Sequence, residues 1–490
     1  MRYAVGIVLT FCTCSLLRAE TELTVYAGGF AVVRESLPLD LHAGVNEVRY
    51  SNVTEKLDHG TAVLRDLSGK SSFEVLEQTY HSGALGMVKA LADYEGQTID
   101  FLVKEGDRNS IVKGKVVRAG VNPEMLGNQS PQYADPVIEL DGTVQFRLPG
   151  VPIFPHLPAD TVIKPELVWK ISAPKASKVD ANLTYLTEGL SWSGDYSAIL
   201  DESGMIRSLK GFISVANQTG RSFDNARVTV IAGDVDRQQP AEAERVIVTG
   251  SNVPLERNPG PYAQSRYFDE YHAYPLKEPI TLREAESKQV GFMQAENVVA
   301  KRSFVYEAGN GGENVREDAA LLGPALASLS VTRVSIECDF KNDKASKLGL
   351  PLPRGRWHFF RLDESQRLDF IGDAGLQDIP ENEEVRARMG NAFDLVGERR
   401  QAKFNYDETK HTLEESFEIK LRNHRPQPVE IRVIEHPFRW RDWKIVAQSD
   451  PVAGPNMNTI EFHVSVQPNT ERVVTYTILY SHIPTPRDGE

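Results

Sequence analysis

The sequence predicts a mainly β protein made of several antiparallel β-sandwich or barrel units with few short helices. Three observations lead to this prediction. Apolar and polar residues alternate strictly in several segments, polar turn-forming residues separate these segments, and strands do not alternate regularly with helices. A period of two is typical of strands that bury one face, and closely spaced strands with polar turns indicate antiparallel sandwiches or barrels.

The alternation is clearest in three segments, each of which is predicted as a half-buried strand. Phe417, Ile419 and Leu421 alternate with charged residues, and residues 460–466 and 226–232 follow the same pattern. One face of such a strand packs on a core while the other meets water.

Helix signals are few. Residues 82–94 carry an apolar stripe at helical spacing, with Ser82 as the expected N-cap and Gly96 as the stop. A second, weaker signal lies at residues 383–389. We therefore expect short helices at these two places and strands and loops elsewhere.

Length and composition restrict the class of protein. The chain has 490 residues, 41% of them hydrophobic and 25% charged, with a formal net charge of −13. This composition is typical of a globular protein with more than one domain. An acidic chain without a basic run is not expected to bind nucleic acid, because that affinity comes mostly from Lys and Arg neutralising phosphates. No stretch after residue 19 is long and apolar enough to span a membrane.

The N-terminus is predicted to be a signal peptide, residues 1–19. Arg2 precedes an uncharged run over Tyr3–Leu17, and cleavage is expected after Ala19, with retention as an N-terminal anchor as the alternative. The remaining chain then keeps Cys338 as its one cysteine and forms no internal disulfide. A large exported protein without disulfides is typical of a bacterial envelope, so we expect the periplasm or outer envelope, or secretion.

Composition and turn signals divide the rest of the chain into four predicted units. Residues 20–95 form a small β unit with a helix, and residues 96–150 a small barrel-like unit in which Gly114 marks a bulge or tight corner. Residues 151–178 are predicted as a linker. The last two units are a β domain over 179–402, with a long loop at 238–268, and a C-terminal immunoglobulin-like sandwich over 403–485.

The third unit carries motifs that resemble the bacterial domain-of-unknown-function family 4139, which is related to mucoidy-inhibitor-like proteins. The matching segments are Gly189-Leu190-Ser191-Trp192 with Tyr196, Asn217 to Gly220, Phe223 to Val228, Ala232 to Val235, and further pieces at 271–282, 352–357 and 390–399. They follow the family order over residues 180–485. The resemblance implies an exported β-rich protein and brings no catalytic residues with it. The N-terminal domain and coiled coil of many relatives are not visible here.

The sequence contains no signature of a known catalytic site. It lacks G-x-S-x-G, Walker, H-E-x-x-H and C-x-x-C motifs, and its histidines show no metal-ligand spacing. Cys338 lies on an apolar strand face, which favours a buried packing role over a nucleophile. We therefore name no catalytic residue, and a non-enzymatic protein is the preferred interpretation.

Two aromatic clusters are candidate binding residues. Trp192, Asp195 and Tyr196 combine rings with a carboxylate, as in carbohydrate platforms, although such aromatic residues more commonly belong to a sandwich core. The second cluster lies within residues 262–274 and consists of Tyr262, Tyr267, Tyr271 and Tyr274. This segment is either a loop that recognises a partner or an extra strand that packs on the sheet.

Asp234 and Asp236 are weak candidates for a metal site. Residues i and i+2 of a strand share a face, and paired carboxylates suit Ca²⁺. The alternative is a strand-end turn in which Arg237 neutralises one of them. Calcium is accordingly the one cofactor considered, and the preferred interpretation has none.

Together these features predict an exported envelope protein that binds or scaffolds a protein or glycan partner without catalysis. A carboxylate-dependent hydrolase of glycans or peptides is the first alternative, because carboxylate pairs leave no linear signature. A calcium-stabilised adhesive module is the second. The sequence does not fix an oligomeric state.

Overall fold

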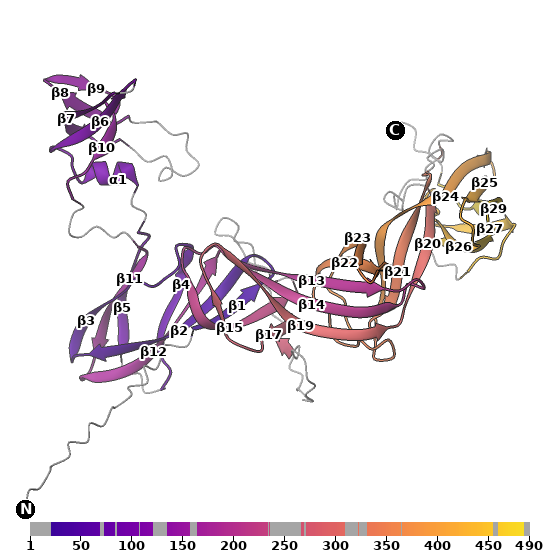
Figure 1. Ribbon diagram of the computed structural model, residues 1–490, viewed down its shortest axis with the longest axis horizontal. Helices are drawn as coiled ribbons and strands as arrows, with labels where there is room; N and C mark the ends of the chain where they lie inside the picture. Colours follow the sequence, from indigo (N-terminus) through magenta and orange to yellow (C-terminus); the bar gives the residue numbers. More distant parts are fainter. Residues whose placement is uncertain are drawn as a thin grey trace, which may run out of the picture.

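The computed structural model describes residues 21–68, 73–83, 86–106, 108–120, 135–156, 164–233, 235, 266–268, 271–308, 322, 331–363, 365–453 and 459–484. The predicted mainly β fold is confirmed: within these residues the chain forms five sheets, no sheet closes into a barrel, and the helix is α1 (Met87–Ala92). The predicted signal peptide and most of the predicted loop 238–268 lie outside the described residues. The sheets follow one another in an elongated arrangement (Figure 1).

The central sheet has eight strands drawn from distant parts of the chain. Its order is β16-β17-β15-β1-β2-β12-β4, with β18 paired to β15. The bounds are β1 (Thr21–Tyr26), β2 (Phe30–Leu41), β4 (Leu57–Asp66), β12 (Ser177–Glu188), β15 (Phe223–Ala232), β16 (Arg266–Phe268), β17 (Tyr271–Pro275) and β18 (Ile280–Leu282). The β1–β15 pair is parallel, whereas β1–β2 and β2–β12 are antiparallel.

The small sheet lies beside one end of the central sheet. It consists of β3 (Gly44–Tyr50), β11 (Glu166–Ala173) and β5 (Glu74–His81) in that order. Because β11 pairs along its length with β3 and β5, the segment predicted as a linker over 151–178 holds a central strand instead. The strands predicted to form one unit over 20–95 are shared between the small and central sheets.

The inserted sheet lies between β5 and β11 in the chain and has its own small core. Its order is β10-β6-β7-β8-β9, with bounds β6 (Thr98–Glu105), β7 (Arg108–Arg118), β8 (Val137–Leu140), β9 (Thr143–Gln145) and β10 (Val151–Ile153). The edge strands β9 and β10 do not pair in the described residues, so the predicted barrel is an open sheet. Helix α1 begins at Met87, after the extended Gly86, and not at the predicted cap Ser82.

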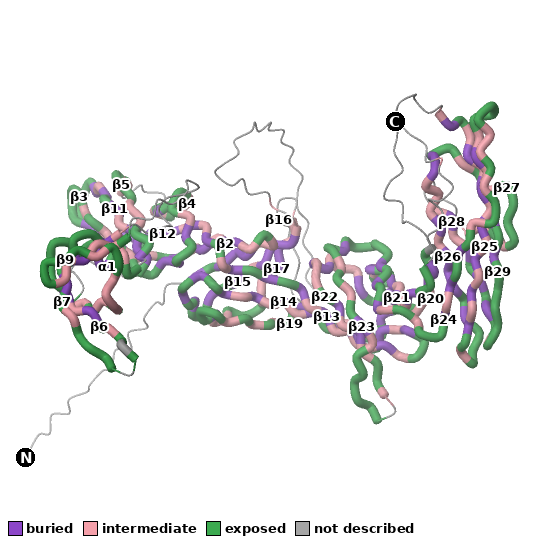
Figure 2. Tube along the Cα trace, turned by 90° about the horizontal axis from the view of Figure 1, so that it is seen from above, coloured by how far each residue is buried: buried purple, intermediate pink, exposed green. Residues whose placement is uncertain are grey.

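The middle sheet continues the molecule beyond the central sheet. Its order is β19-β14-β13-β22-β23, with bounds β13 (Leu190–Leu200), β14 (Ile206–Asn217), β19 (Glu286–Val298), β22 (Gly355–Leu362) and β23 (Leu368–Leu376). Buried residues of the central, small and middle sheets belong to one continuous apolar core. Along the strands, buried and exposed residues alternate (Figure 2), as the period of two predicts.

The C-terminal sheet folds its two halves against each other as a sandwich. Its order is β27-β29-β25-β24-β21-β20-β26-β28, with bounds β20 (Ala300–Ala308), β21 (Arg333–Lys341), β24 (Glu384–Asp407), β25 (Thr412–Asn423), β26 (Val429–Glu435), β27 (Trp443–Gln448), β28 (Ile460–Val466) and β29 (Thr470–Tyr480). Phe462 of β28 contacts Tyr476 of β29, with ring centroids 5.8 Å apart, although the sheet order separates these strands. A second core lies between the halves.

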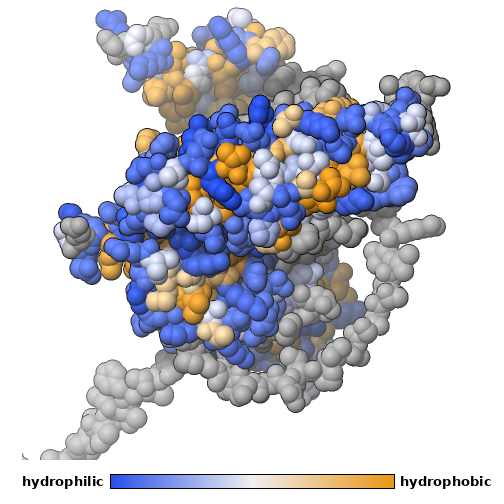
Figure 3. Space-filling model, turned by 90° about the vertical axis from the view of Figure 1, so that its right-hand side faces the viewer, coloured by the Kyte–Doolittle hydropathy of each residue, from blue (hydrophilic) through white to orange (hydrophobic). Residues whose placement is uncertain are grey.

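Strand β24 overturns two expectations. It pairs with β21 over Glu384–Val396 and with β25 over Leu395–Asp407, so pairing runs through the predicted domain boundary at 402/403. The helix expected at 383–389 is the start of this strand, because Val385, Ala387 and Met389 are buried at a spacing of two. Viewed from the C-terminal sheet, the surface is largely hydrophilic with apolar patches between (Figure 3).

Candidate outer groove of the central sheet

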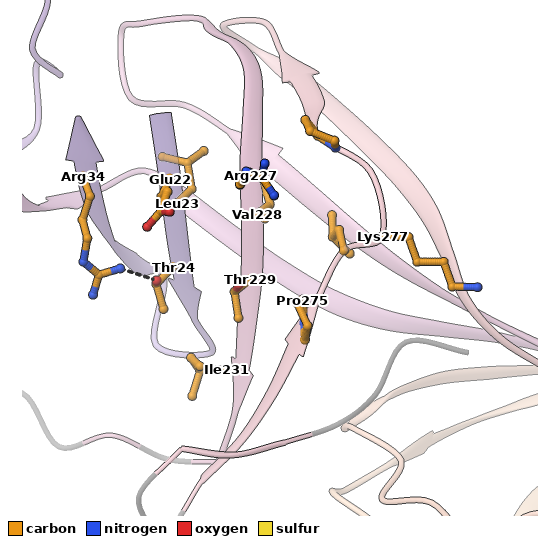
Figure 4. Close-up of a pocket in the computed structure, with 12 residues that line it drawn as sticks. Glu22, Leu23, Thr24, Arg34, Arg227, Val228, Thr229, Ile231, Pro275 and Lys277 are labelled. Carbon is orange, nitrogen blue, oxygen red and sulfur yellow. Dashed lines mark hydrogen bonds between the residues drawn. The ribbon is translucent and has the colours of Figure 1, made fainter. Parts of the chain in front are cut away.

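A groove with a volume of about 410 Å³ lies on the outer face of the central sheet. Its floor comes from β1, β2 and β15, and one wall comes from the chain that leaves β17 (Figure 4). The groove is lined by Glu22, Leu23, Thr24, Arg34, Arg227, Val228, Thr229, Ile231, Pro275, Leu276, Lys277 and Pro279. We call it the outer groove.

Strand alternation explains why polar side chains form the floor. On β1, Leu23 and Val25 are fully buried in the core, which turns Glu22 and Thr24 to the opposite face. The register then places Thr24 beside Thr229 in the parallel β1–β15 pair. The floor therefore presents hydroxyl groups between strands whose other face is apolar.

The electrostatics of the outer groove centre on one carboxylate between two guanidinium groups. Glu22 lies opposite Arg34 on β2 and opposite Arg227 on β15. Arg34 Nη1 donates a hydrogen bond of 3.1 Å to Thr24 Oγ1 (Figure 4). Lys277 belongs to the wall, and its side chain points away from the floor. The outer groove thus combines one carboxylate with two guanidinium groups and two threonine hydroxyl groups, in a protein that is acidic overall.

An aromatic pair lies at the end of the same sheet face. Tyr26 follows Glu22 and Thr24 at a spacing of two, and its ring stacks on Phe30 with centroids 4.6 Å apart. Burial raises the pKa of Tyr26, and the positive charge of Arg34 opposes that rise. Tyr26 is half-buried and lies beside Ile231 of β15, which lines the outer groove.

The predicted platform of Trp192, Asp195 and Tyr196 is divided between the two faces of β13. Trp192 and Tyr196 face the core, where Tyr196 stacks on Trp357 at 4.4 Å and donates a hydrogen bond of 2.7 Å to the Pro353 carbonyl. Asp195 lies on the opposite face and accepts a hydrogen bond from Ser214. Trp192 and Tyr196 are therefore core residues with a polar handle, the more common role of such residues in a sandwich.

The predicted recognition segment 262–274 contributes strands to the central sheet. Tyr274 is buried and donates a hydrogen bond of 3.1 Å to the Pro351 carbonyl, while Tyr271 is half-buried beside Gly233. Tyr267 belongs to β16, which pairs with β17, and Tyr262 lies outside the described residues. The segment adjoins the outer groove through β17, whose last residue, Pro275, lines it.

The two predicted metal ligands, Asp234 and Asp236, lie outside the described residues. In the part of the chain that the structure describes, no three His, Cys, Asp or Glu side chains are grouped to hold a metal ion. Cys338 is fully buried, and burial raises the pKa of its thiol to about 12, which confirms a packing role.

One pair of acidic side chains resembles what the hydrolase alternative requires. Glu337 and Asp339 lie two residues apart on β21. Arg432 from β26 pairs with both, at 2.9 Å from Glu337 and 3.6 Å from Asp339. Burial raises the pKa of Glu337, and Arg432 opposes that rise. Because a guanidinium occupies the space between the carboxylates, this is an ion-pair cluster and not an acid–base pair facing across a cleft.

The sequence prediction did not identify the outer groove. Glu22, Arg34 and Arg227 are ordinary outward-facing residues of three strands, and they come together only through the parallel β1–β15 register. The signal that was available is the charge at outward positions of otherwise apolar strands, as in residues 30–41. That signal alone does not distinguish a groove from a solvated sheet face.

Comparison with known proteins does not identify a relative of this chain. No protein-family model matches the chain, and a search of curated proteins returns no match. Among the residues that the structure describes, no helix has the length and apolar character that a membrane crossing requires.

Proposed function

We propose that this protein is an exported, non-catalytic binding or scaffolding component of a bacterial envelope, and that the outer groove holds part of a protein or glycan partner. The observation that carries this proposal is a groove of about 410 Å³ whose floor offers hydroxyl and guanidinium groups on an open sheet face. This volume lies within the range of small-ligand sites, roughly 300–1,000 Å³.

The groups in the outer groove suit recognition better than acid–base chemistry. Hydrolysis by two carboxylates needs a pair flanking the bond that is cleaved. Glu22 is the one carboxylate among the lining residues, and it lies between Arg34 and Arg227. The guanidinium and hydroxyl groups can orient a sugar or peptide by hydrogen bonds, and Tyr26 supplies an aromatic edge beside them.

The proposed compartment and family rest on the sequence. A charged start, an apolar run ending before Arg18 and a mature chain with one cysteine support export into a bacterial envelope. The motifs between residues 180 and 485 support a relationship to the domain-of-unknown-function family 4139. That relationship implies no activity, so the ligand class is proposed from the outer groove alone.

The test is ligand binding by a variant that fills the outer groove. Thr229→Trp places a large ring on the floor, whereas Thr79→Trp places the same ring on β5 of the small sheet, outside the groove. We expect wild type and Thr79→Trp to bind the same glycans on an array, or the same envelope protein in affinity capture, and Thr229→Trp to lose that binding at least tenfold. Equal binding by all three proteins would contradict the proposal.

A further inference from the structure

A cluster of arginines lies where strands β20 and β21 of the C-terminal sheet pass from one apolar core to the other. Cys338 and Phe340 of β21 belong to the core shared with the middle sheet, and the Phe340 ring lies 5.2 Å from that of Trp357. Val334 of β21 and Tyr306 of β20 belong instead to the second core. We call the boundary between these cores, occupied by Arg302 and Phe304 of β20, the seam.

The tight turn between β13 and β14 fixes one side of the seam. A Cβ atom on Gly204 would lie 2.3 Å from the backbone nitrogen of Arg302, so the turn touches β20 at this residue. Arg361, near the end of β22, lies beside Leu200 at the end of β13. The middle sheet therefore brings Arg361 to the same place as Arg302.

The aromatic ring of Phe304 carries two guanidinium groups. The guanidinium carbon of Arg302 lies 5.7 Å from the ring centroid, and that of Arg425, from the loop between β25 and β26, lies 5.1 Å from it. In the described part of the chain, the side chains of Arg302, Arg361 and Arg425 make no hydrogen bond or ion pair. Their N–H donors are therefore available to a ligand.

The charge in the seam is incompletely balanced. Burial lowers the pKa of Arg302, the positive charges of Arg425 and Arg361 lower it further, and Glu202 partly opposes them. Asp369 lies opposite Arg361 in the β22–β23 pair without forming an ion pair with it. Arginine remains charged in proteins, so a bound anion would relieve this repulsion further.

We propose that Arg302, Arg361 and Arg425 form a binding site for a phosphate group at the seam. A guanidinium is a planar fork of donors that matches phosphate oxygens in pairs, and the two forks over the Phe304 ring can bind a tetrahedral oxyanion together with the nearby Arg361. The phosphate is either the inorganic ion or a monoester of a larger molecule. The site is separate from the outer groove, which lies on a different sheet.

Isothermal titration of the full chain with inorganic phosphate and with glycerol phosphate, at constant ionic strength set with chloride, tests this proposal. The variant is Arg425→Gln, which changes a loop residue. Its matched control is Arg441→Gln, because Arg441 lies over a different ring, 5.2 Å from the Trp440 centroid, outside the seam. We expect wild type and Arg441→Gln to bind phosphate alike and Arg425→Gln to bind it at least tenfold more weakly.

A second variant separates charge from geometry. Arg302→Lys keeps the positive charge but lacks the planar fork, so we expect phosphate affinity to fall while the circular dichroism spectrum stays unchanged. Tighter binding of glycerol phosphate than of phosphate would assign the site to a phosphorylated molecule, and equal binding to the free ion. No phosphate binding by wild type, or equal binding by wild type, Arg425→Gln and Arg302→Lys, would overturn the proposal.

Discussion

Arginines occupy two kinds of environment in this protein, and the comparison separates structural charges from ligand-facing ones. In the C-terminal sandwich, Arg439 and Glu415 are both fully buried and form a two-point ion pair, with bonds of 3.1 and 2.7 Å. At the seam, Arg302 and Arg425 lie over one phenylalanine ring without a bound carboxylate. The first arrangement pairs its charges within the chain, whereas for the second we propose a counter-charge from a bound anion.

The central sheet contains a buried ion pair of the same kind. Arg221 donates to both carboxylate oxygens of Glu35, and Tyr50 donates a bond of 3.0 Å to the same carboxylate. Burial raises the pKa of Tyr50 to about 12, and the negative charge of Glu35 adds to the rise. Such buried pairs place each charge beside a counter-charge of the same chain, which indicates a structural role.

The largest expected effect on stability comes from breaking the buried Arg439–Glu415 ion pair. Glu415→Gln removes the negative charge that pairs with the buried Arg439 guanidinium. We expect a loss of about 3–5 kcal/mol in the free energy of unfolding of the C-terminal sandwich. Denaturant unfolding followed by tryptophan fluorescence measures it.

The neighbouring pair supplies the control for this substitution. Glu414 on the same strand forms an exposed ion pair with Lys403 at 2.6 Å, so Glu414→Gln should cost less than about 1 kcal/mol. Equal losses for the two variants would show that the buried pair is not a structural element.

A smaller loss is expected when Glu35 is replaced by Gln. Arg221 keeps the Asn52 carbonyl and the Tyr185 hydroxyl as partners, so we expect a loss of about 3 kcal/mol, at the lower end for a broken buried pair. The same change should lower the pKa of Tyr50, which an ultraviolet titration of the folded protein detects. An unchanged Tyr50 titration would contradict the network.

Acid should reduce the stability that Asp201 contributes in the exposed turn between β13 and β14, beside the seam. Burial favours a raised pKa for Asp201, but hydrogen bonds from Ser203 and Met205 and the charge of Arg207 outweigh it, so the pKa lies below its usual value of 3.8. A lowered folded-state pKa stabilises the fold above the unfolded pKa, and this contribution is lost as the pH falls through the folded pKa.

The substitution Asp201→Asn tests that direction. Its stability difference from wild type should be full near neutral pH and should shrink below about pH 4. Thermal unfolding at several pH values measures the difference. A difference that stays constant into strong acid would exclude the proposed contribution of the ionised carboxylate.

The smallest stability effect is expected at the seam. Arg302→Gln removes a charge that two other arginines repel, so in phosphate-free buffer we expect a change within about 0.5 kcal/mol or a slight stabilisation. A loss comparable to that of Glu415→Gln, measured by the same denaturant unfolding, would place Arg302 among the structural charges.

The sequence predicted strands well where alternation was strict. The strand over Phe417–Leu421 and the strand Ile460–Val466 are present, with their apolar residues buried. It could not predict pairing between distant strands, such as Leu23 with Val228 in the parallel β1–β15 pair. Register depends on both partners, and a local pattern contains only one of them.

The same limit explains what was missed at the sites. Trp192 and Tyr196 share a strand with Asp195, but alternation turns the carboxylate to the other face. The outer groove and the seam each combine residues from three or more strands or loops. Neither leaves a motif in the linear sequence, because its members are brought together by sheet pairing alone.

Photo-cross-linking in the native cell tests most directly the central claim that the outer groove binds a partner. A photoreactive amino acid at position 229 lies on the groove floor, and the same group at position 79 lies on the small sheet outside it. We predict that position 229 gives a discrete glycan or protein adduct and that position 79 does not. Absence of an adduct at position 229, or the same adducts from both positions, would contradict the proposed binding role.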